Sequence, residues 1–182
     1  MALVLETLPG ETFSRMLRRA RRRLAARDIA VFGIQICSAL RYLHHRGMLH
    51  LDVKPSNIIV HGGIAKIIDL GLARRPGRGE PGIGTDSYLA PEQARGGALS
   101  PATDVFGLGT VFYRAATGKL AFESDGDRGR YEQLVRRADP VGAHRKLPAP
   151  LARAIDGCLD PDPALRPSVG ALTRELQRVL RS

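Results

Sequence analysis

Residues 49–60 read "LHLDVKPSNIIV" and set a His, an Asp, a Lys and an Asn between two short apolar runs. The Lys follows the Asp by two residues, and the Asn follows it by five. This spacing is suited to holding a phosphoryl group, whose transfer needs a positioned acceptor, bridging metal ions and neutralised charge rather than covalent help. The stretch therefore predicts a polar loop between two short apolar runs that is suited to holding such a group.

Four side chains in and after this loop are candidates for that chemistry. Asp52 can accept or orient the proton of an attacking hydroxyl, and Lys54 can reach the transferring phosphate. Asn57 offers a neutral oxygen to a magnesium ion. Asp69 directly follows the apolar run 65–68 and precedes a Leu-Gly pair. A carboxylate at such a strand end can supply the second hard oxygen ligand for Mg²⁺.

Composition indicates one globular domain with a hydrophobic core, since 43% of the 182 residues are apolar and 25% are charged. No run of eighteen uncharged apolar residues occurs, so no membrane-spanning helix is expected. The start, "MALVLETLPGE", lacks the basic and apolar regions of a secretory signal. Cys37 and Cys158 lie in apolar-periodic stretches, which favours buried, reduced thiols in a cytoplasmic protein.

The formal net charge is +10, and much of it lies in "RRARRRLAAR", from Arg18 to Arg27. Such a run either faces an acidic partner, a nucleic acid or a membrane surface, or forms a solvated helix face. No aromatic residues interleave with the arginines, as single-stranded nucleic acid binding would favour. We therefore expect a solvated face and no nucleic-acid partner.

Hydrophobic periodicity and turn residues predict a mainly α (α+β) chain with few strands. Asp28 is a plausible N-cap, and Gly47 is a plausible stop for the helix that follows it. The expected elements are strands at 2–6, 58–60 and 65–68, the last two forming a hairpin, helices at 28–47 and 104–118, an irregular stretch at 74–84, and helical segments within 149–180 interrupted by "DPDPALRPS".

Three motifs in order resemble those of the eukaryotic-type Ser/Thr protein kinases, and bacterial members most closely. The stretch from His50 to Asn57, "HLDVKPSN", is similar to the catalytic loop HRDLKPxN. Asp69-Leu70-Gly71 is similar to DFG. Ala90-Pro91-Glu92, within "GTDSYLAPEQARG", is similar to APE and the substrate-docking loop before it. In the family, the segment from DFG to APE, here residues 69–92, is called the activation segment.

Two further positions extend the resemblance, which runs from Leu3 to the C-terminus in the family's order and spacing. Asp104 in "ATDVFGLG" resembles the helix Asp that anchors the catalytic-loop backbone. Arg166 in "DPDPALRPS" resembles the Arg that pairs with the APE glutamate, which is Glu92 here. Several ordered motifs are far more specific than one isolated match.

The resemblance implies a protein-kinase-like C-terminal lobe that is helical with a small β-hairpin. Residues 1–8 would be the last strand of the N-terminal lobe and a hinge remnant, and residues 9–182 would be the C-lobe. The hinge from Glu6 to Leu8 would contact adenine through its backbone, and Ile59 would lie beneath the adenine ring. ATP and Mg²⁺ are the implied cofactors, and a protein with a Ser or Thr acceptor is the implied substrate.

The same resemblance assigns supporting roles near the loop. His50 and Leu70 would belong to a stacked apolar column that links the two lobes. Thr85 sits where the family uses a Thr to bond the catalytic Asp and Lys, here Asp52 and Lys54. The Lys two residues after the Asp also implies serine or threonine rather than tyrosine acceptors.

Leu51 departs from the family pattern, because most regulated members carry there an Arg that pairs with a phosphorylated activation segment. Between Leu70 and Gly84 the chain has no Ser, Thr or Tyr. The receiving charge and the acceptor hydroxyl are therefore missing together. The hypothesis that follows is an activation segment that needs no phosphorylation.

The N-lobe motifs are a second departure, because no GxGxxG loop or VAIK-type lysine precedes the catalytic loop. The interpretation is a C-lobe without an N-lobe, which residues before Met1 or a separately encoded chain would supply. Two alternatives stay open: a non-catalytic, pseudokinase-like binding module, and a small-molecule kinase of the aminoglycoside-phosphotransferase type. Lys54 and the APE-like segment speak against the latter.

Overall fold

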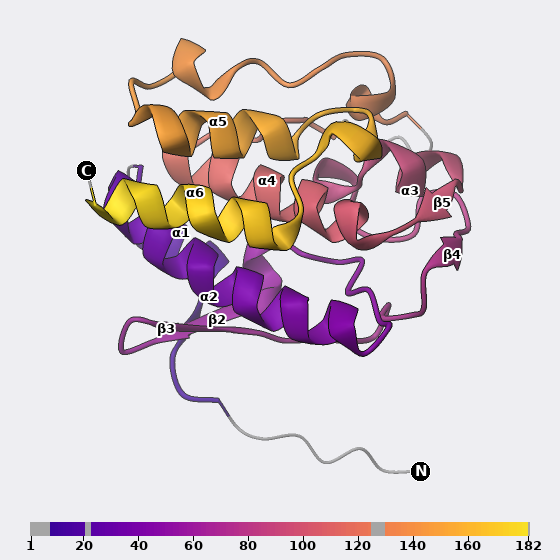
Figure 1. Cartoon of the computed structure of the whole chain (residues 1–182), viewed down its shortest axis with the longest axis horizontal. Helices are drawn as coiled ribbons and strands as arrows, with labels where there is room; N and C mark the ends of the chain where they lie inside the picture. Colours follow the sequence, from indigo (N-terminus) through magenta and orange to yellow (C-terminus); the bar gives the residue numbers. More distant parts are fainter. Residues whose placement is uncertain (1–7, 21–22, 125–129, 182) are drawn as a thin grey trace.

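Helix α4 (Pro101–Thr117) runs through the centre of the molecule and is buried along almost all of its length. The computed structural model describes residues 8–20, 23–124 and 130–181. Figure 1 shows α4 between α5 (Ala149–Cys158) and α2 (Ala26–His45), with α6 (Val169–Arg181) packed across α2. The remaining helices are α1 (Phe13–Arg19) and the short α3 (Pro91–Arg95).

A small antiparallel sheet lies against α2. Its order is β1 (Glu11–Thr12), β2 (Ile58–His61) and β3 (Ile64–Ile67). The turn between β2 and β3 consists of two glycines at positive φ, +55° and +79°, as a tight hairpin turn requires. A second sheet pairs β4 (Gly77–Arg78) with β5 (Ala98–Leu99).

The predicted helices and the hairpin are confirmed, with shifted ends. The helix predicted from Asp28 begins at Ala26, so Asp28 lies in its first turn and is not the N-cap. Gly47 follows the end of that helix at a φ of +69°, the left-handed conformation that stops a helix. The helix predicted at 104–118 begins at Pro101, with Ser100 as its N-cap and Gly118 as its C-cap.

Three short strands, β1, β4 and its partner β5, were not expected. β1 adds a third strand to the predicted hairpin, and β4 interrupts the stretch 74–84 that we expected to be irregular. Each has only two residues, so none carries a recognisable alternation of apolar and polar side chains. The strand predicted at 2–6 lies outside the described residues.

The described arginines of the basic run are solvent-exposed, as the solvated-face interpretation expects. They do not share one helix, because the run crosses from the end of α1 to the start of α2. Arg19 pairs with Glu11 at 2.5 Å, and Arg18 donates to the Ser14 hydroxyl at 2.8 Å. No helix among the described residues is both long enough and apolar enough to cross a bilayer.

Both cysteine thiols are free and buried. Burial raises the pKa of the Cys37 thiol to about 12, and it also raises the pKa of Cys158. Both side chains therefore remain protonated, apolar parts of the core at neutral pH.

The crossing of α4 and α5 depends on a glycine. A Cβ added at Gly109 would lie 2.6 Å from Cys158 Cβ and 3.1 Å from Leu159 Cδ2. We expect Gly109→Ala to lower the free energy of unfolding by about 1–2 kcal/mol, because overpacking outweighs the gain in helix propensity. Gly170→Ala is the matched control, since its Cβ would meet only Arg174 Nη1, at 3.8 Å. Urea denaturation of both variants tests this, and equal stability changes would contradict it.

Candidate active site

The loop from His50 to Asn57 is anchored to the core by one carboxylate from α4. Asp104 Oδ1 accepts from the Leu51 backbone N–H at 2.7 Å. Its Oδ2 accepts from the His50 backbone N–H at 2.9 Å and lies 2.8 Å from His44 Nε2. The Asp104 side chain is fully buried. Because a buried carboxylate must be matched by donors, these contacts fix the start of the loop.

The His50 ring joins this loop to the residues after β3. The ring is fully buried, and its Nδ1 accepts from the Asp52 backbone N–H at 3.2 Å. Its Nε2, 3.1 Å from the Ile68 carbonyl oxygen, must therefore carry the proton and donate to it. The ring thus holds Asp52 and the segment leading to Asp69 in one arrangement.

Three polar side chains meet at the centre of the site. Lys54 Nζ lies 2.7 Å from Asp52 Oδ2 and donates to the Thr85 hydroxyl at 2.7 Å. The same hydroxyl donates to Asp52 Oδ1 at 2.9 Å. The Asp52 and Lys54 side chains are 10% and 22% exposed, so both can be reached from solvent while being held by protein. The structure thus brings the activation segment directly onto the catalytic loop.

Asn57 and Asp69 are the two predicted metal ligands. The Asn57 amide nitrogen donates to the Asp52 side chain and backbone at 2.9 and 3.0 Å, which directs the amide oxygen toward other ligands. Asp69 is exposed, lies at a φ of +66° and accepts at Oδ1 from the Gly71 N–H at 3.1 Å. The Asn57 carbonyl accepts from the Ile68 N–H at 2.9 Å. Because Asp69 directly follows Ile68, Asn57 and Asp69 belong to neighbouring backbone segments.

These two oxygen donors fit Mg²⁺, which takes few protein ligands when phosphate oxygens and water complete its shell. Among the described residues no group of three or more His, Cys, Asp or Glu side chains could hold a metal by itself.

The predicted nucleotide-contacting residues are only partly placed. Glu6 lies outside the described residues, and Leu8 lies at their edge, partly buried. Ile59 pairs with Thr12 and Lys66 in the sheet and is half-buried, whereas its neighbours on β2 belong to the core. Alternation along the strand therefore turns Ile59 away from the core.

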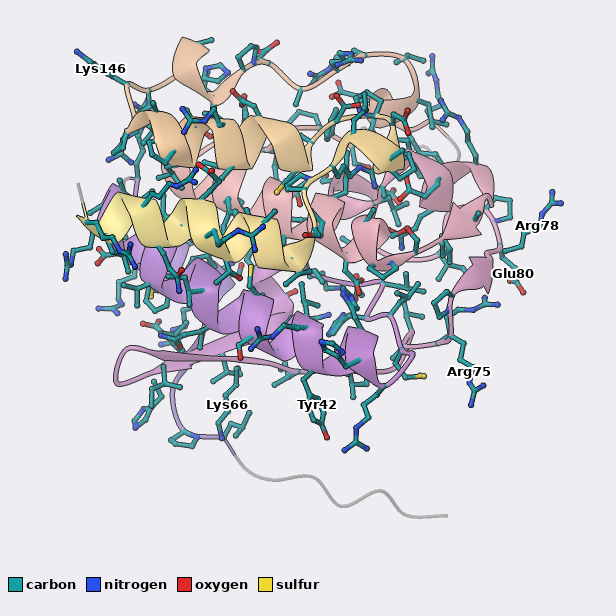
Figure 2. All side chains as sticks on the ribbon, viewed as in Figure 1. Tyr42, Lys66, Arg75, Arg78, Glu80 and Lys146 are labelled. Atoms are coloured by element: carbon teal, nitrogen blue, oxygen red, sulfur yellow. The ribbon has the colours of Figure 1, made fainter. Side chains whose placement is uncertain are left out.

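Two residues of the predicted apolar column differ in exposure. His50 is fully buried, whereas the Leu70 side chain is 54% exposed. Leu70 lines a shallow hollow with Tyr42 and Leu43 of α2. Figure 2 shows Tyr42 projecting outward at this part of the surface.

The end of the activation segment is fixed by a buried ion pair. Arg166 Nη1 and Nη2 donate to Glu92 Oε1 and Oε2 at 2.7 and 2.9 Å. The Thr103 hydroxyl also donates to Glu92 Oε1 at 2.9 Å, and the guanidinium lies 4.8 Å from the Phe106 ring centroid. The Arg166 side chain is fully buried. A bidentate, fully hydrogen-bonded pair of this kind fixes geometry strongly.

Leu51 uses its side chain for packing, where the family places a phosphate-binding arginine. It is 4% exposed and forms a small apolar cluster with Leu49 and Leu99. Leu99 belongs to β5, which pairs with β4 of the activation segment. The segment is thus connected to the catalytic loop through apolar packing and a strand pair.

We expect activity in this protein to be independent of activation-segment phosphorylation, because apolar contacts take the place of the charged pair. Arg75, Arg78 and Glu80 of this segment project into solvent and away from the loop (Figure 2). Phosphopeptide mapping of active protein is the measurement. Stoichiometric phosphate on Thr85 or Ser87 that is required for activity would contradict the prediction.

Two buried glutamines were missed by reasoning from the sequence. Gln93 bridges the catalytic loop and the activation segment, and Gln133 donates to the Asp86 and Leu89 carbonyls at 2.9 and 3.0 Å. Each is 4% exposed. The only available signal was the position of Gln93 directly after the APE-like motif.

Comparison with known proteins agrees with this geometry. A family model described as protein kinase domain matches residues 1–177. The chain is 36% identical over 170 residues to the serine/threonine-protein kinase PknA of Mycobacterium tuberculosis, covering 90% of this chain and 39% of PknA. It is 32% identical over 174 residues to the probable serine/threonine-protein kinase PkwA of Thermomonospora curvata, covering 93% of this chain and 23% of PkwA.

A third relative is the serine/threonine-protein kinase PknK of Mycobacterium tuberculosis, 35% identical over 164 residues. The match covers 84% of this chain and 15% of PknK. The chain therefore spans well under half the length of each of these relatives. With the family model matching nearly its whole length and the motif residues meeting at one site, the chain belongs to the protein kinase domain family.

Proposed function

We propose that this chain is the C-lobe of a protein kinase that transfers the γ-phosphate of ATP to Ser or Thr hydroxyls of a protein substrate. The observation that carries the proposal is the contact of Asp52, Lys54 and Thr85 within 2.7–2.9 Å of one another. These groups provide a carboxylate for the acceptor hydroxyl and a cation for the developing phosphate charge.

In the proposed mechanism each side chain acts on the acceptor or on the transferring group. Asp52 orients the acceptor hydroxyl and takes its proton as the new P–O bond forms, while the bond between the γ-phosphorus and the β,γ-bridging oxygen of ATP breaks and ADP leaves. Lys54 offsets negative charge on the transferring phosphoryl group. The Thr85 hydroxyl holds both side chains in position. Mg²⁺ bound at Asn57 and Asp69 would neutralise the phosphate oxygens of ATP.

The N-lobe is also part of the proposal. We propose that residues 1–8 form the end of an N-lobe and the hinge, and that residues 9–182 form the C-lobe. The support is that the catalytic-loop, DFG-like and APE-like motifs all lie within residues 9–182. The intact mass of the protein from its native cells tests this. Extra residues before Met1 would place the N-lobe on the same polypeptide, and a mass matching residues 1–182 would direct the search to a partner chain.

Nucleotide binding separates the catalytic proposal from a pseudokinase-like binding module. We expect Mg²⁺·ATP to raise the melting temperature of the protein isolated from native cells, because ligand binding stabilises the folded state. Asp69→Ala should abolish that shift and phosphate transfer to Ser- and Thr-containing peptides, and Glu80→Gln is the control. No shift with the wild-type protein, together with no effect of Asp69→Ala, would favour the binding module.

A further inference from the structure

We propose that Gln93 is a positioning residue for phosphoryl transfer: its carboxamide holds the activation segment against the catalytic loop so that the Thr85 hydroxyl reaches Asp52. The inference rests on the proposed kinase function. It adds a residue that acts through Thr85 and that needs no contact with ATP or substrate.

Both polar atoms of the Gln93 carboxamide form hydrogen bonds. Its Nε2 donates to the Leu51 carbonyl at 2.9 Å and to the Ile83 carbonyl at 3.1 Å. Its Oε1 accepts from the Ala90 N–H at 3.2 Å. The backbone carbonyl of the same residue accepts from the Gly82 N–H at 3.0 Å. One residue of α3 thus joins the catalytic loop to three residues of the activation segment, Gly82, Ile83 and Ala90.

The positions of these carbonyls link the glutamine to the reacting groups. Leu51 immediately precedes Asp52, and Ile83 lies two residues before Thr85. The catalytic loop and the activation segment therefore contact each other a second time close by, where the Thr85 hydroxyl donates to Asp52 Oδ1 at 2.9 Å. The amide of Gln93 and this hydroxyl form two successive connections between the same pair of segments.

Gly84 shows how closely the segments approach. It lies between Ile83 and Thr85 at a φ of +131°. A Cβ there would lie 3.3 Å from the Leu51 carbonyl oxygen and 3.4 Å from Gln93 Nε2. This close approach is kept while Gln93 Nε2 binds both carbonyls, and losing these bonds removes two of the contacts that maintain it. We therefore expect Thr85 to move relative to Asp52 when the amide is lost.

The side chain at position 51 explains why an uncharged link serves here. The Leu51 side chain packs into the apolar cluster with Leu49 and Leu99 and cannot bind a charged group of the activation segment. Its carbonyl remains available, and Gln93 uses it. A hydrogen bond between two neutral groups forms without phosphorylation. This agrees with an activation segment that is held against the catalytic loop without being phosphorylated.

Gln93→Met tests the inference, because methionine keeps the length and removes both N–H donors. Gln133→Met is the matched control, since Gln133 is equally buried and also donates to two carbonyls, but these belong to Asp86 and Leu89 of the activation segment rather than to the catalytic loop. We expect the two variants to lower the melting temperature by similar amounts. Gln93→Met should lower kcat about 10–100-fold through misplacement of reacting groups, with the KM for ATP changed less than about 3-fold.

Hydrogen exchange provides a readout that needs no activity. Exchange over Gly82–Thr85 should rise in Gln93→Met, whereas Gln133→Met should raise it over 86–89. If wild-type protein is active and both variants lose kcat equally, the inference is overturned and the proposed function stands. If wild-type protein transfers no phosphate, the proposed function and the catalytic role of Gln93 fail together. Unchanged exchange over Gly82–Thr85 in Gln93→Met would overturn the link itself.

Discussion

Replacing Arg166 with methionine is expected to lower the free energy of unfolding by about 3–5 kcal/mol, since removing one partner of a buried ion pair leaves the other charge uncompensated. The Glu92 carboxylate would keep only the Thr103 hydroxyl as a side-chain donor. Arg166 also donates to the Asp160, Pro161 and Ala102 carbonyls at 2.8–3.2 Å, and these acceptors would lose their bonds as well. Urea denaturation followed by circular dichroism measures the loss.

Arg137→Met is the control for this prediction. Arg137 also pairs with a carboxylate, that of Asp160, but at 3.5 Å and with a side chain that is 71% exposed. An exposed pair of this kind contributes about 0–1 kcal/mol, so the variant should remain close to wild type. If both variants lost a similar free energy of unfolding, burial of the Arg166–Glu92 pair would not determine how much the pair contributes to stability.

Asp52→Asn is expected to lower kcat about 10²–10⁴-fold while leaving the fold intact, because an amide cannot take the proton of the acceptor hydroxyl. An Asn side chain can keep the hydrogen bond from the Thr85 hydroxyl at its oxygen. It loses the charge that pairs with Lys54 at 2.7 Å. The measurement is phosphate transfer to a Ser-containing peptide by protein isolated from native cells with any partner it carries.

Glu80→Gln removes an exposed carboxylate from the same activation segment and should leave kcat within about 3-fold of wild type. Melting temperatures of the two variants show whether folding is affected. If Asp52→Asn kept most of the wild-type kcat, Asp52 would not be the proton acceptor, and the proposed mechanism would have to be abandoned.

The sequence predicted the long elements well because their patterns are local. The buried helix at α4 and the hairpin of β2 and β3 follow from apolar periodicity, glycine turns and caps. The contacts of Asp104, Arg166 and Thr85 were expected from the resemblance to protein kinases, in which the residues at these positions contact each other. This holds even for Glu92 and Arg166, which are 74 positions apart in the sequence.

What the sequence did not indicate depends on tertiary packing. The two-residue strands β1, β4 and β5 form because a partner strand lies beside each of them, and two residues carry no periodic pattern. Gln93 and Gln133 donate to backbone carbonyls. Because every residue has a backbone carbonyl, the sequence gives no indication of which residues accept these hydrogen bonds. The start of α2 was misplaced because an acidic residue in a first turn resembles an N-cap.

The carboxylate of Asp104 has a consequence for how the protein fluctuates. It belongs to the most buried helix and binds the first two amides of the catalytic loop, so loop and helix form one cooperative unit. Opening that part of the loop would leave a buried carboxylate without two of its donors, which is costly in free energy. We therefore expect the arrangement around Asp52 to be lost together with the core, and not to loosen gradually, as the protein is destabilised.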